Sequence, residues 1–541
     1  MSLLVGTLMA VTASSALGLI LSLIFGALTT SIAGWSLAAG ALVGILIFRY
    51  AAVTCERMRF GYEAWIVLFL YSLFSLRQFL WIYFYRGGAM WTLDAYNIGD
   101  LPLHLTHIFN FVEGATFWPE NPLMTGETMR YPFGVDLFAA LWLKAGIPVE
   151  RTLPLMGLAA AALLGFALFR WAGALGVAAF LFGGGAQNLA WKSLPLALWI
   201  PQRGFLFALP AGLLLLWAWR RRYLQKRPSM AILTEGVLWG CLPLFHVHTF
   251  LFISLIFVLW VIVGRRFRDG IYTFLWAVVP ASLLVWNLTD GFQMVSLIWW
   301  KPGWLIGEEN PLLFLWKNFG LMIPAVAIAV YAAWRQRSVE HAWLLGPGIV
   351  MFVALFFVMV SPWDWDNTKM MIWCYLIVLA PLNELLLKDP SPFLRILVFA
   401  ALFYPGVYAV ADSTGKTKGI QVADLKELDP VCQAVQKLNP EARFLTAPVY
   451  NHPVSLCGRK VVAGYGGHLW SHGIDSKEVD GRIRKLMSGD AAWHTIARTL
   501  GAGYLYWGPR EEREFPGSKK PWENKARRLA HGDWGALYDI T

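Results

Sequence analysis

A polar segment, residues 91–131, holds the side chains whose types and spacing best suit chemistry. It concentrates aspartate, glutamate and histidine in a chain of which only 15% of the residues are charged. Asp100, His104 and His107 follow one another at i, i+4 and i+7, so a helix through this stretch carries them on one face. Carboxylates and imidazoles placed together can act as general bases and acids. Asp94 precedes them and is a second candidate for the same role.

The opposite face of the predicted helix is apolar, with Leu101, Leu105, Ile108 and Phe109. An amphipathic helix lying at a membrane surface has the same pattern and needs no catalytic role. Both interpretations remain open at this point.

The composition indicates a polytopic membrane protein. Of 541 residues, 57% are hydrophobic and 15% are charged, whereas soluble domains are nearer one half and one quarter. The net charge of +11 does not indicate a nucleic-acid-binding protein, because the basic residues occupy short breaks between apolar runs, as in cytoplasmic loops. These breaks contain Arg220, Arg221, Arg222, Lys226, Arg227, Arg265, Arg266, Arg268, Arg335 and Arg337.

The apolar runs predict roughly thirteen transmembrane helices, with the N-terminus cytoplasmic and the C-terminus outside. The first run has no basic n-region, so we interpret it as a retained span and not a cleaved signal peptide. Between Arg227 and Arg265 the stretch is long enough for two crossings, with a break at residues 244–249. The other expected spans are residues 3–27, 32–53, 62–84, 153–169, 176–190, 205–219, 271–288, 314–334, 341–360, 372–387 and 393–410.

Two domains follow from this pattern. Residues 1–411 form a transmembrane module with an extracytoplasmic loop, 85–150, whose second interfacial helix spans 134–145. Residues 412–541 form a soluble extracytoplasmic α/β domain of about 130 residues. Its expected strands are 443–447, 460–463, 504–507 and 535–540, and its expected helices are 429–437 and 475–487.

Cysteine usage excludes a disulfide-dense fold, since the chain has 5 cysteines. Cys432 and Cys457 are the ones in the exported domain, and they could pair in an oxidising compartment.

The predicted topology places polar residues from separate segments on the same outer side. The topology follows from the arginine positions and the lengths of the apolar runs alone. The acidic residues were not used to infer it, so their placement on one side is an independent result. The group contains Asp94, Asp100, His104, Gln202, Arg203, His246, His248, Lys301, Asp364, Asp366, Asn367 and Lys369.

This group suits transfer from a lipid-phosphate donor. A carboxylate can take the proton of an acceptor hydroxyl, while cationic and amide groups hold a leaving phosphate. Arg203 and Lys369 suit the phosphate, with Gln202, His246 and His248 beside them and Lys301 or Arg77 as further cations. Arg77 lies inside an expected span, where it is functional, paired or extended toward the interface. Likewise, His246 and His248 could share a metal ion or form a hydrogen-bonded pair.

Several short motifs resemble the GT-C superfamily of membrane glycosyltransferases. They are LDAYNIGDLPLHL in the first large loop, YPFG at Tyr131, PQRG at Pro201, PWDWDN at Pro362 and YLYWGPRE at Tyr504. The plan of the whole chain is similar to the bacterial members of the protein O-mannosyltransferase and aminoarabinose-transferase branch. The resemblance implies an inverting transferase of the cell envelope that uses a polyprenyl-phosphate sugar. It also implies a multi-pass protein of the bacterial inner (plasma) membrane with a periplasmic domain.

The resemblance implies that the catalytic acidic residue, which acts as the base, is Asp100 or Asp94. Asp100 is preferred, because His104 follows it as a histidine often does in the family. The usual second acidic residue is missing, since Ala95 and Leu101 follow the two aspartates. Asp364 and Asp366 match the sequence pattern of a metal-binding DxD motif, so a divalent ion could be a cofactor. The two residues could also be structural.

Other functional classes stay open. Intramembrane charges also line the pathways of secondary transporters, although no internal repeat is evident. A non-catalytic scaffold of a glycan export complex is a further alternative, and it predicts that Asp100 and Asp364 tolerate alanine. The acceptor of a transferase would be a glycan, a lipid or a protein.

Overall fold

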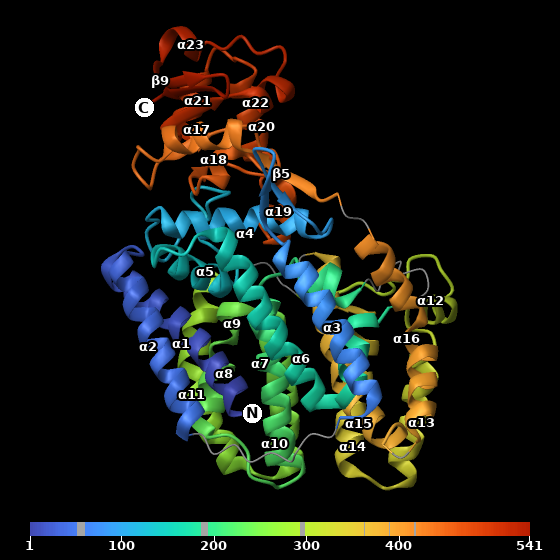
Figure 1. The fold of residues 1–541 in the computed structure, drawn as a ribbon. Coiled ribbons are helices and arrows are strands. Elements are labelled where there is room, and N and C mark those ends of the chain that lie inside the picture. Colours follow the sequence, from blue (N-terminus) through green and yellow to red (C-terminus); the bar gives the residue numbers. More distant parts are fainter. Residues whose placement is uncertain (51–59, 185–192, 293–297, 362, 389, 416–417) are drawn as a thin grey trace.

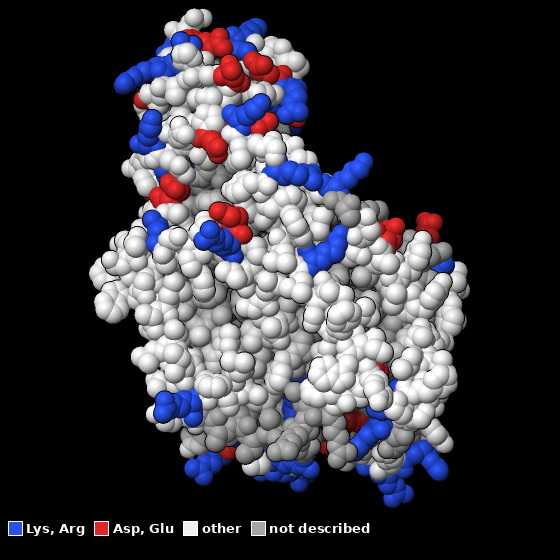
Figure 2. Space-filling view, viewed as in Figure 1, with Lys and Arg blue, Asp and Glu red and all other residues white. Residues whose placement is uncertain are grey.

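The computed structural model describes residues 1–50, 60–184, 193–292, 298–361, 363–388, 390–415 and 418–541. An apolar body of helices forms the larger part, α4 (Asn97–Val112) lies across one end of it, and the C-terminal domain stands above α4 (Figure 1). In Figure 2, a broad uncharged band separates basic residues at the lower end from charges of both signs around the C-terminal domain. Such a band suits the hydrocarbon layer of a membrane.

Among the described residues, 8 helices are long and apolar enough to cross a membrane, or up to 9 if one bent pair counts as a span. The expectation of roughly thirteen spans is therefore not confirmed. The helices are α1 (Ser2–Phe25), α2 (Thr30–Tyr50), α3 (Tyr62–Leu80), α6 (Val149–Phe182), α10 (Val247–Gly264), α11 (Phe267–Leu288), α15 (Thr368–Leu386, extended by the 3₁₀ turn Asp364–Asn367) and α16 (Pro392–Gly415).

Backbone breaks account for much of the difference in number. Within α6, non-helical backbone at Ala172 and Gly173 separates the expected spans 153–169 and 176–190, and α6 ends at Phe182, so the two segments count as one helix. Residues 185–190 of the second expected span lie outside the described residues. The expected span 314–334 is divided into α12 (Pro311–Phe319) and α13 (Met322–Arg335), which meet at 92°. Gly173 and Gly320 adopt positive φ, 61° and 49°, which glycine tolerates best.

Other apolar helices are shorter than a typical span. They are α7 (Phe205–Trp219), α8 (Ile232–Gly240), α9 (Leu242–Phe245) and α14 (Val339–Ala354). The break expected within residues 244–249 is confirmed, because His246 is extended (φ −161°, ψ 107°) between α9 and α10.

A small sheet joins the polar segment to the C-terminal domain. β1 (Phe84–Arg86) and β2 (Ala89–Thr92) form a hairpin, and β5 (Ile420–Asp424) pairs with β2 in antiparallel register, with Met90 opposite Ala423. The helix expected at residues 134–145 is α5 (Gly134–Lys144), and most of its residues are buried.

The C-terminal domain contains both strands and helices, as expected. A 5-stranded sheet has the order β7-β6-β8-β10-β9, in which β6 is parallel to β7 and β8, and β10 is antiparallel to β8 and β9. The strands are β6 (Arg443–Leu445), β7 (Lys460–Val461), β8 (Tyr504–Trp507), β9 (Arg527–Gly532) and β10 (Gly535–Asp539). The helices are α17 (Leu425–Val435), α18 (Pro453–Leu456), α19 (Gly466–Ser471), α20 (Lys477–Met487), α21 (Trp493–Thr499), α22 (Pro509–Glu514) and α23 (Trp522–Lys525).

Cys432 and Cys457 form a disulfide, with Cα atoms 5.1 Å apart. The bridge links α17 to the end of α18, next to the domain's contact with α4. Cys241 and Cys374 are buried free thiols, and Cys55 lies outside the described residues.

The disulfide predicts a specific alkylation pattern. In protein exported to an oxidising compartment and denatured without reductant, Cys241 and Cys374 should react with iodoacetamide, while Cys432 and Cys457 remain linked. Peptide mass spectrometry before and after reduction measures this directly. Recovery of alkylated Cys432 and Cys457 peptides without reduction would contradict it.

Candidate functional site

A polar cavity of about 180 Å³ lies where the apolar body, α4 and the C-terminal domain meet. Separate parts of the chain form its walls: the start of α4, the loop before α5, the α9–α10 break, the start of α15 and α19. Of the residues singled out in the sequence, it is lined by Asp100, Gln202, His246, His248, Asp366 and Lys369. The structure also places Arg130, Tyr131, Trp363, His468 and His472 in the lining.

Asp100 lies on α4, a helix that is buried on both faces. Asp100 stands in the first turn, where a carboxylate interacts favourably with the helix dipole. The apolar residues Leu101, Leu105 and Ile108 are fully buried, and so are His104 and His107 on the other face. The helix is thus enclosed between the membrane helices and the C-terminal domain (Figure 1), unlike one that lies with its polar face in water.

Both helix histidines bind a carboxylate that the sequence analysis did not single out. His104 Nδ1 lies 2.9 Å and His107 Nδ1 3.3 Å from Oδ2 of Asp136, in the first turn of α5. Asp136 is 1% exposed. Burial alone would raise the pKa of Asp136, but the two histidines hold it well below its ordinary value. A lone acid in an otherwise apolar helix was the signal that could have identified it.

Arg203 completes this buried group. Its Nε lies 3.7 Å from Oδ1 of Asp136, and the residue is 1% exposed. Among the described residues, none of its guanidinium nitrogens has a hydrogen-bond partner, and neither does the buried amide oxygen of Gln202. A buried cation without such partners is costly, so this position favours an anion or ordered water beside Arg203.

His104, His107 and Asp136 are also a group that could hold a metal ion, since three ligand atoms lie within 4.8 Å of one another. Two imidazoles and a carboxylate suit zinc and related ions. Hydrogen bonds from both Nδ1–H groups to Asp136 account for the same atoms without an ion.

The DxD-like pair fits a shared metal ion poorly. Asp366 pairs with Lys369, with Oδ1 and Nζ 2.9 Å apart, and Asp364 pairs with Lys301. Each carboxylate is thus matched by its own lysine, and Asp366 and Lys369 face the cavity. Asn367 has a structural role, because its amide donates to the carbonyls of Leu355 and Val358 and accepts from the amide of Val360.

The C-terminal domain supplies part of the cavity wall. Tyr131 packs between His107 and His472, with ring centroids 5.4 Å and 4.7 Å away. His468 donates from Nε2 to the carbonyl of Gly99, 2.9 Å away, at the start of α4. Burial keeps the pKa of His472 well below its ordinary value, so its ring is neutral at physiological pH. The i, i+4 spacing of His468 and His472 was a signal that the sequence analysis left unused.

Asp94 and Arg77 are not among the lining residues of the cavity. Asp94 accepts from the amide of Tyr96 at 2.9 Å, and Arg77 donates to the carbonyl of Thr414 next to the C-terminal domain. Burial raises the pKa of Asp94 to about 6, although the nearby charge of Arg77 opposes the shift.

No protein-family model matches the chain, and no curated protein matches it either. Solved structures similar to the chain include the oligosaccharyltransferase of the archaeon Archaeoglobus fulgidus in its apo form. The two are 13% identical, the match covers 83% of this chain and 70% of the archaeal chain, and the TM-score is 0.48. The same archaeal enzyme in complex with an inhibitory peptide and a dolichol-phosphate has 12% identity, 89% and 74% coverage, and a TM-score of 0.47. A third structure, tethered to an acceptor peptide with an NVT sequon, has 14% identity, the same coverage and a TM-score of 0.47.

Replacing Asp136 tests the buried group. Asp136→Asn removes the charge that compensates Arg203 and one acceptor for the histidines, and breaking a buried charged network costs roughly 3–5 kcal/mol. We therefore expect a large drop in the melting temperature of the purified protein. Asp290→Asn is the matched control: its carboxylate binds Arg130 at 3.0 Å but is 39% exposed, so its loss should cost less than about 1 kcal/mol. Equal melting temperatures for the two variants would contradict the role assigned to Asp136.

The raised pKa of Asp94 makes the free energy of unfolding depend on pH. Its pKa in the folded protein, about 6, exceeds the ordinary 3.8, so its contribution is full below pH 4 and is lost as the pH rises through 6. The difference corresponds to about 3 kcal/mol. Thermal unfolding between pH 4 and 7.5 should show a steeper loss of stability in the wild type than in Asp94→Asn. Parallel curves for the two proteins would show that the pKa of Asp94 is not raised.

Proposed function

We propose that the protein is an inverting glycosyltransferase that moves a sugar from a polyprenyl-phosphate donor to an acceptor on the extracytoplasmic side of a membrane. The observation that carries the proposal is the single cavity in which Asp100 lies with Lys369, Arg130 and His246. Its position at the end of an apolar helical body gives a lipid donor and a water-borne acceptor access to the same residues.

Asp100 is the proposed general base. The acceptor hydroxyl gives its proton to the carboxylate while its oxygen bonds to the anomeric carbon of the donor, and the bond from that carbon to the phosphate oxygen breaks. A single displacement inverts the anomeric centre, and polyprenyl phosphate leaves. Asp94 is the less suitable base, because it is not among the residues that line the cavity.

The cations around the cavity suit the phosphate. Lys369 and Arg130 line the cavity, and Arg203, which follows Gln202 in the chain, has no hydrogen-bond partner among the described residues. Charge accumulates on the phosphate oxygens as the sugar leaves, so positive groups fixed beside them lower the barrier. His246 and His248 are further donors, while Lys301 and Arg77 remain predictions, since neither lines the cavity.

An apolar groove of about 350 Å³ offers a path for the polyprenyl chain. It lies between α13, α14 and α15, and Cys374, Tyr375 and Val378 of α15 line it. Lys369 is in the first turn of the same helix. Residues 369–378 of a helix extend about 14 Å, so one helix connects the phosphate site with the groove.

A divalent ion, if the reaction needs one, would fit His104, His107 and Asp136 better than the lysine-paired Asp364 and Asp366. It would supply charge stabilisation beside Arg203. The proposed setting is the inner membrane of a bacterium, with the C-terminal domain in the periplasm, and the acceptor is a glycan, lipid or protein of the cell envelope.

Sugar transfer by the purified protein in lipid tests the proposal. With a panel of radiolabelled polyprenyl-phosphate sugars, we expect Asp100→Asn to lower turnover by about 10²–10⁴-fold while donor binding is retained, since only the base is lost. Lys369→Ala should instead weaken donor binding. Asp94→Asn is the matched control from the same loop and should retain most of its turnover, and a chelator in the same assay reports the need for a metal ion.

Release and transfer of sugar by the wild type, abolished by Asp100→Asn, would establish the transferase and its base. No turnover and no binding with any donor would contradict the proposal and favour a transporter or a scaffold. Unchanged turnover in Asp100→Asn would leave a transferase with a different base.

A further inference from the structure

A groove of about 670 Å³ lies between α13 and α14, in the part of the helical body farthest from the C-terminal domain (Figure 1). It belongs to neither the polar cavity nor the apolar groove along α15, although Ile349 borders both grooves. Its volume is within the roughly 300–1,000 Å³ of typical ligand pockets.

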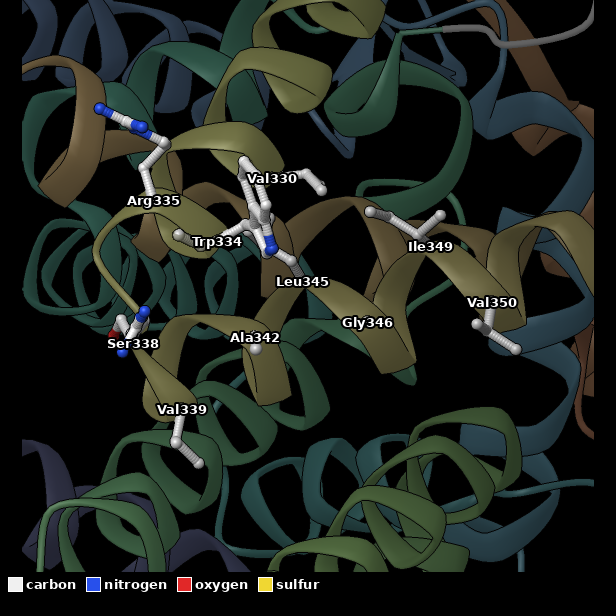
Figure 3. Close-up of a pocket in the computed structure, with 12 residues that line it drawn as sticks. Val330, Trp334, Arg335, Ser338, Val339, Ala342, Leu345, Gly346, Ile349 and Val350 are labelled. Carbon is white, nitrogen blue, oxygen red and sulfur yellow. The ribbon is translucent and has the colours of Figure 1, made fainter.

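The groove has one basic end and one apolar end. Figure 3 shows Arg335 and Ser338 at the turn between the helices, and Ile349 and Val350 at the opposite end. Arg337 also lines the basic end. The wall between the ends is apolar and contains Val330, Trp334, Val339, Ala342 and Leu345.

Arg335 and Arg337 are exposed, and no carboxylate of the described part of the chain pairs with either. Some other arginines toward this end of the molecule are paired: Arg220 binds Glu340 and Glu384, and Arg222 binds Glu235. The two unpaired charges at the groove therefore remain available for an external anion.

The dimensions match one leaflet of a bilayer. From Val339 to Val350, α14 extends about 17 Å, which is about half of the hydrocarbon thickness of roughly 30 Å. Gly346 lies in the middle of the wall, where a Cβ atom would meet nothing within 4 Å. Its missing side chain leaves the groove continuous.

We propose that this groove binds one anionic phospholipid. Its phosphate pairs with Arg335 and Arg337, and one acyl chain lies along Leu345, Ile349 and Val350. Because α14 packs on α15, whose first turn contains Lys369, the lipid also stabilises the helices that carry the polar cavity. The site is independent of the proposed transferase activity, since none of its residues lines that cavity.

Lipid retention by the purified full-length protein tests the proposal. Native mass spectrometry should detect one retained phosphatidylglycerol in preference to phosphatidylcholine. Arg335→Gln with Arg337→Gln should weaken phosphatidylglycerol binding by roughly 25-fold, about a factor of five per arginine. Arg265→Gln with Arg268→Gln is the matched control: it removes the same charge from the turn after α10 and the first turn of α11. Arg265 and Arg337 also both have left-handed φ, 51° and 50°.

A second variant tests the acyl-chain path without changing any charge. Gly346→Leu fills the groove and favours the helix, so the fold should persist while lipid binding falls at least tenfold. Equal weakening by both arginine pairs would show only general attraction to anionic lipid and would overturn the proposal. Binding of soluble glycerol phosphate as tightly as phosphatidylglycerol, or unchanged binding in Gly346→Leu, would overturn the acyl-chain site.

Discussion

Asp136 is a carboxylate buried among helices, and much of the site depends on how its charge is compensated. An uncompensated charge in such surroundings would cost several kcal/mol. His104 and His107 bind it from α4, and Arg203 lies beside it just before α7. This one charge therefore fixes the relative positions of α4, α5 and the start of α7. Asp100, one turn before His104 on the same helix, takes its place at the cavity as a consequence.

The C-terminal domain is held against this arrangement by polar contacts that leave little freedom. Glu120, in the loop after α4, binds Arg443 and Lys460, both at 2.8 Å. Asn110 of α4 donates to the carbonyl of Gly458, where a Cβ atom would lie only 2.5 Å from the backbone of Phe109. With β5 paired to β2 and His468 bonded to Gly99, the domain is a fixed wall of the cavity.

The two ends of the helical body differ in the partners of their positively charged side chains. Near the cavity, Lys369 and Arg130 line space that a ligand can fill, although each also pairs with an aspartate. Arg203 lies beside Asp136 and has no hydrogen-bond partner among the described residues. At the other end, Arg220 joins Glu340 of α14 to Glu384 of α15, and His341 also reaches Glu384 at 3.0 Å. That network holds the helices next to the basic groove. The proposed substrate site and the proposed lipid site can then coexist on the same set of helices, since each has its own cations.

Features that depend on a local pattern were predictable from the amino-acid sequence. The periodicity of α4, the break at His246, the strand Tyr504–Trp507 and the apolar body all follow from side-chain spacing and hydropathy, which act over neighbouring residues. The sequence also identified Asp100, Gln202, His246, His248, Asp366 and Lys369, which line one cavity, although their chemical roles remain predictions.

The contacts between polar groups that are distant in the chain became visible in the folded molecule alone. Asp136 and His472 were missed because their partners are distant in the chain, so no local pattern reveals the contact. The number of spans went unconfirmed for a similar reason. Hydropathy measures apolar content, whereas the course of α6 and of the α12–α13 pair depends on backbone turns at Gly173 and Gly320 that packing selects.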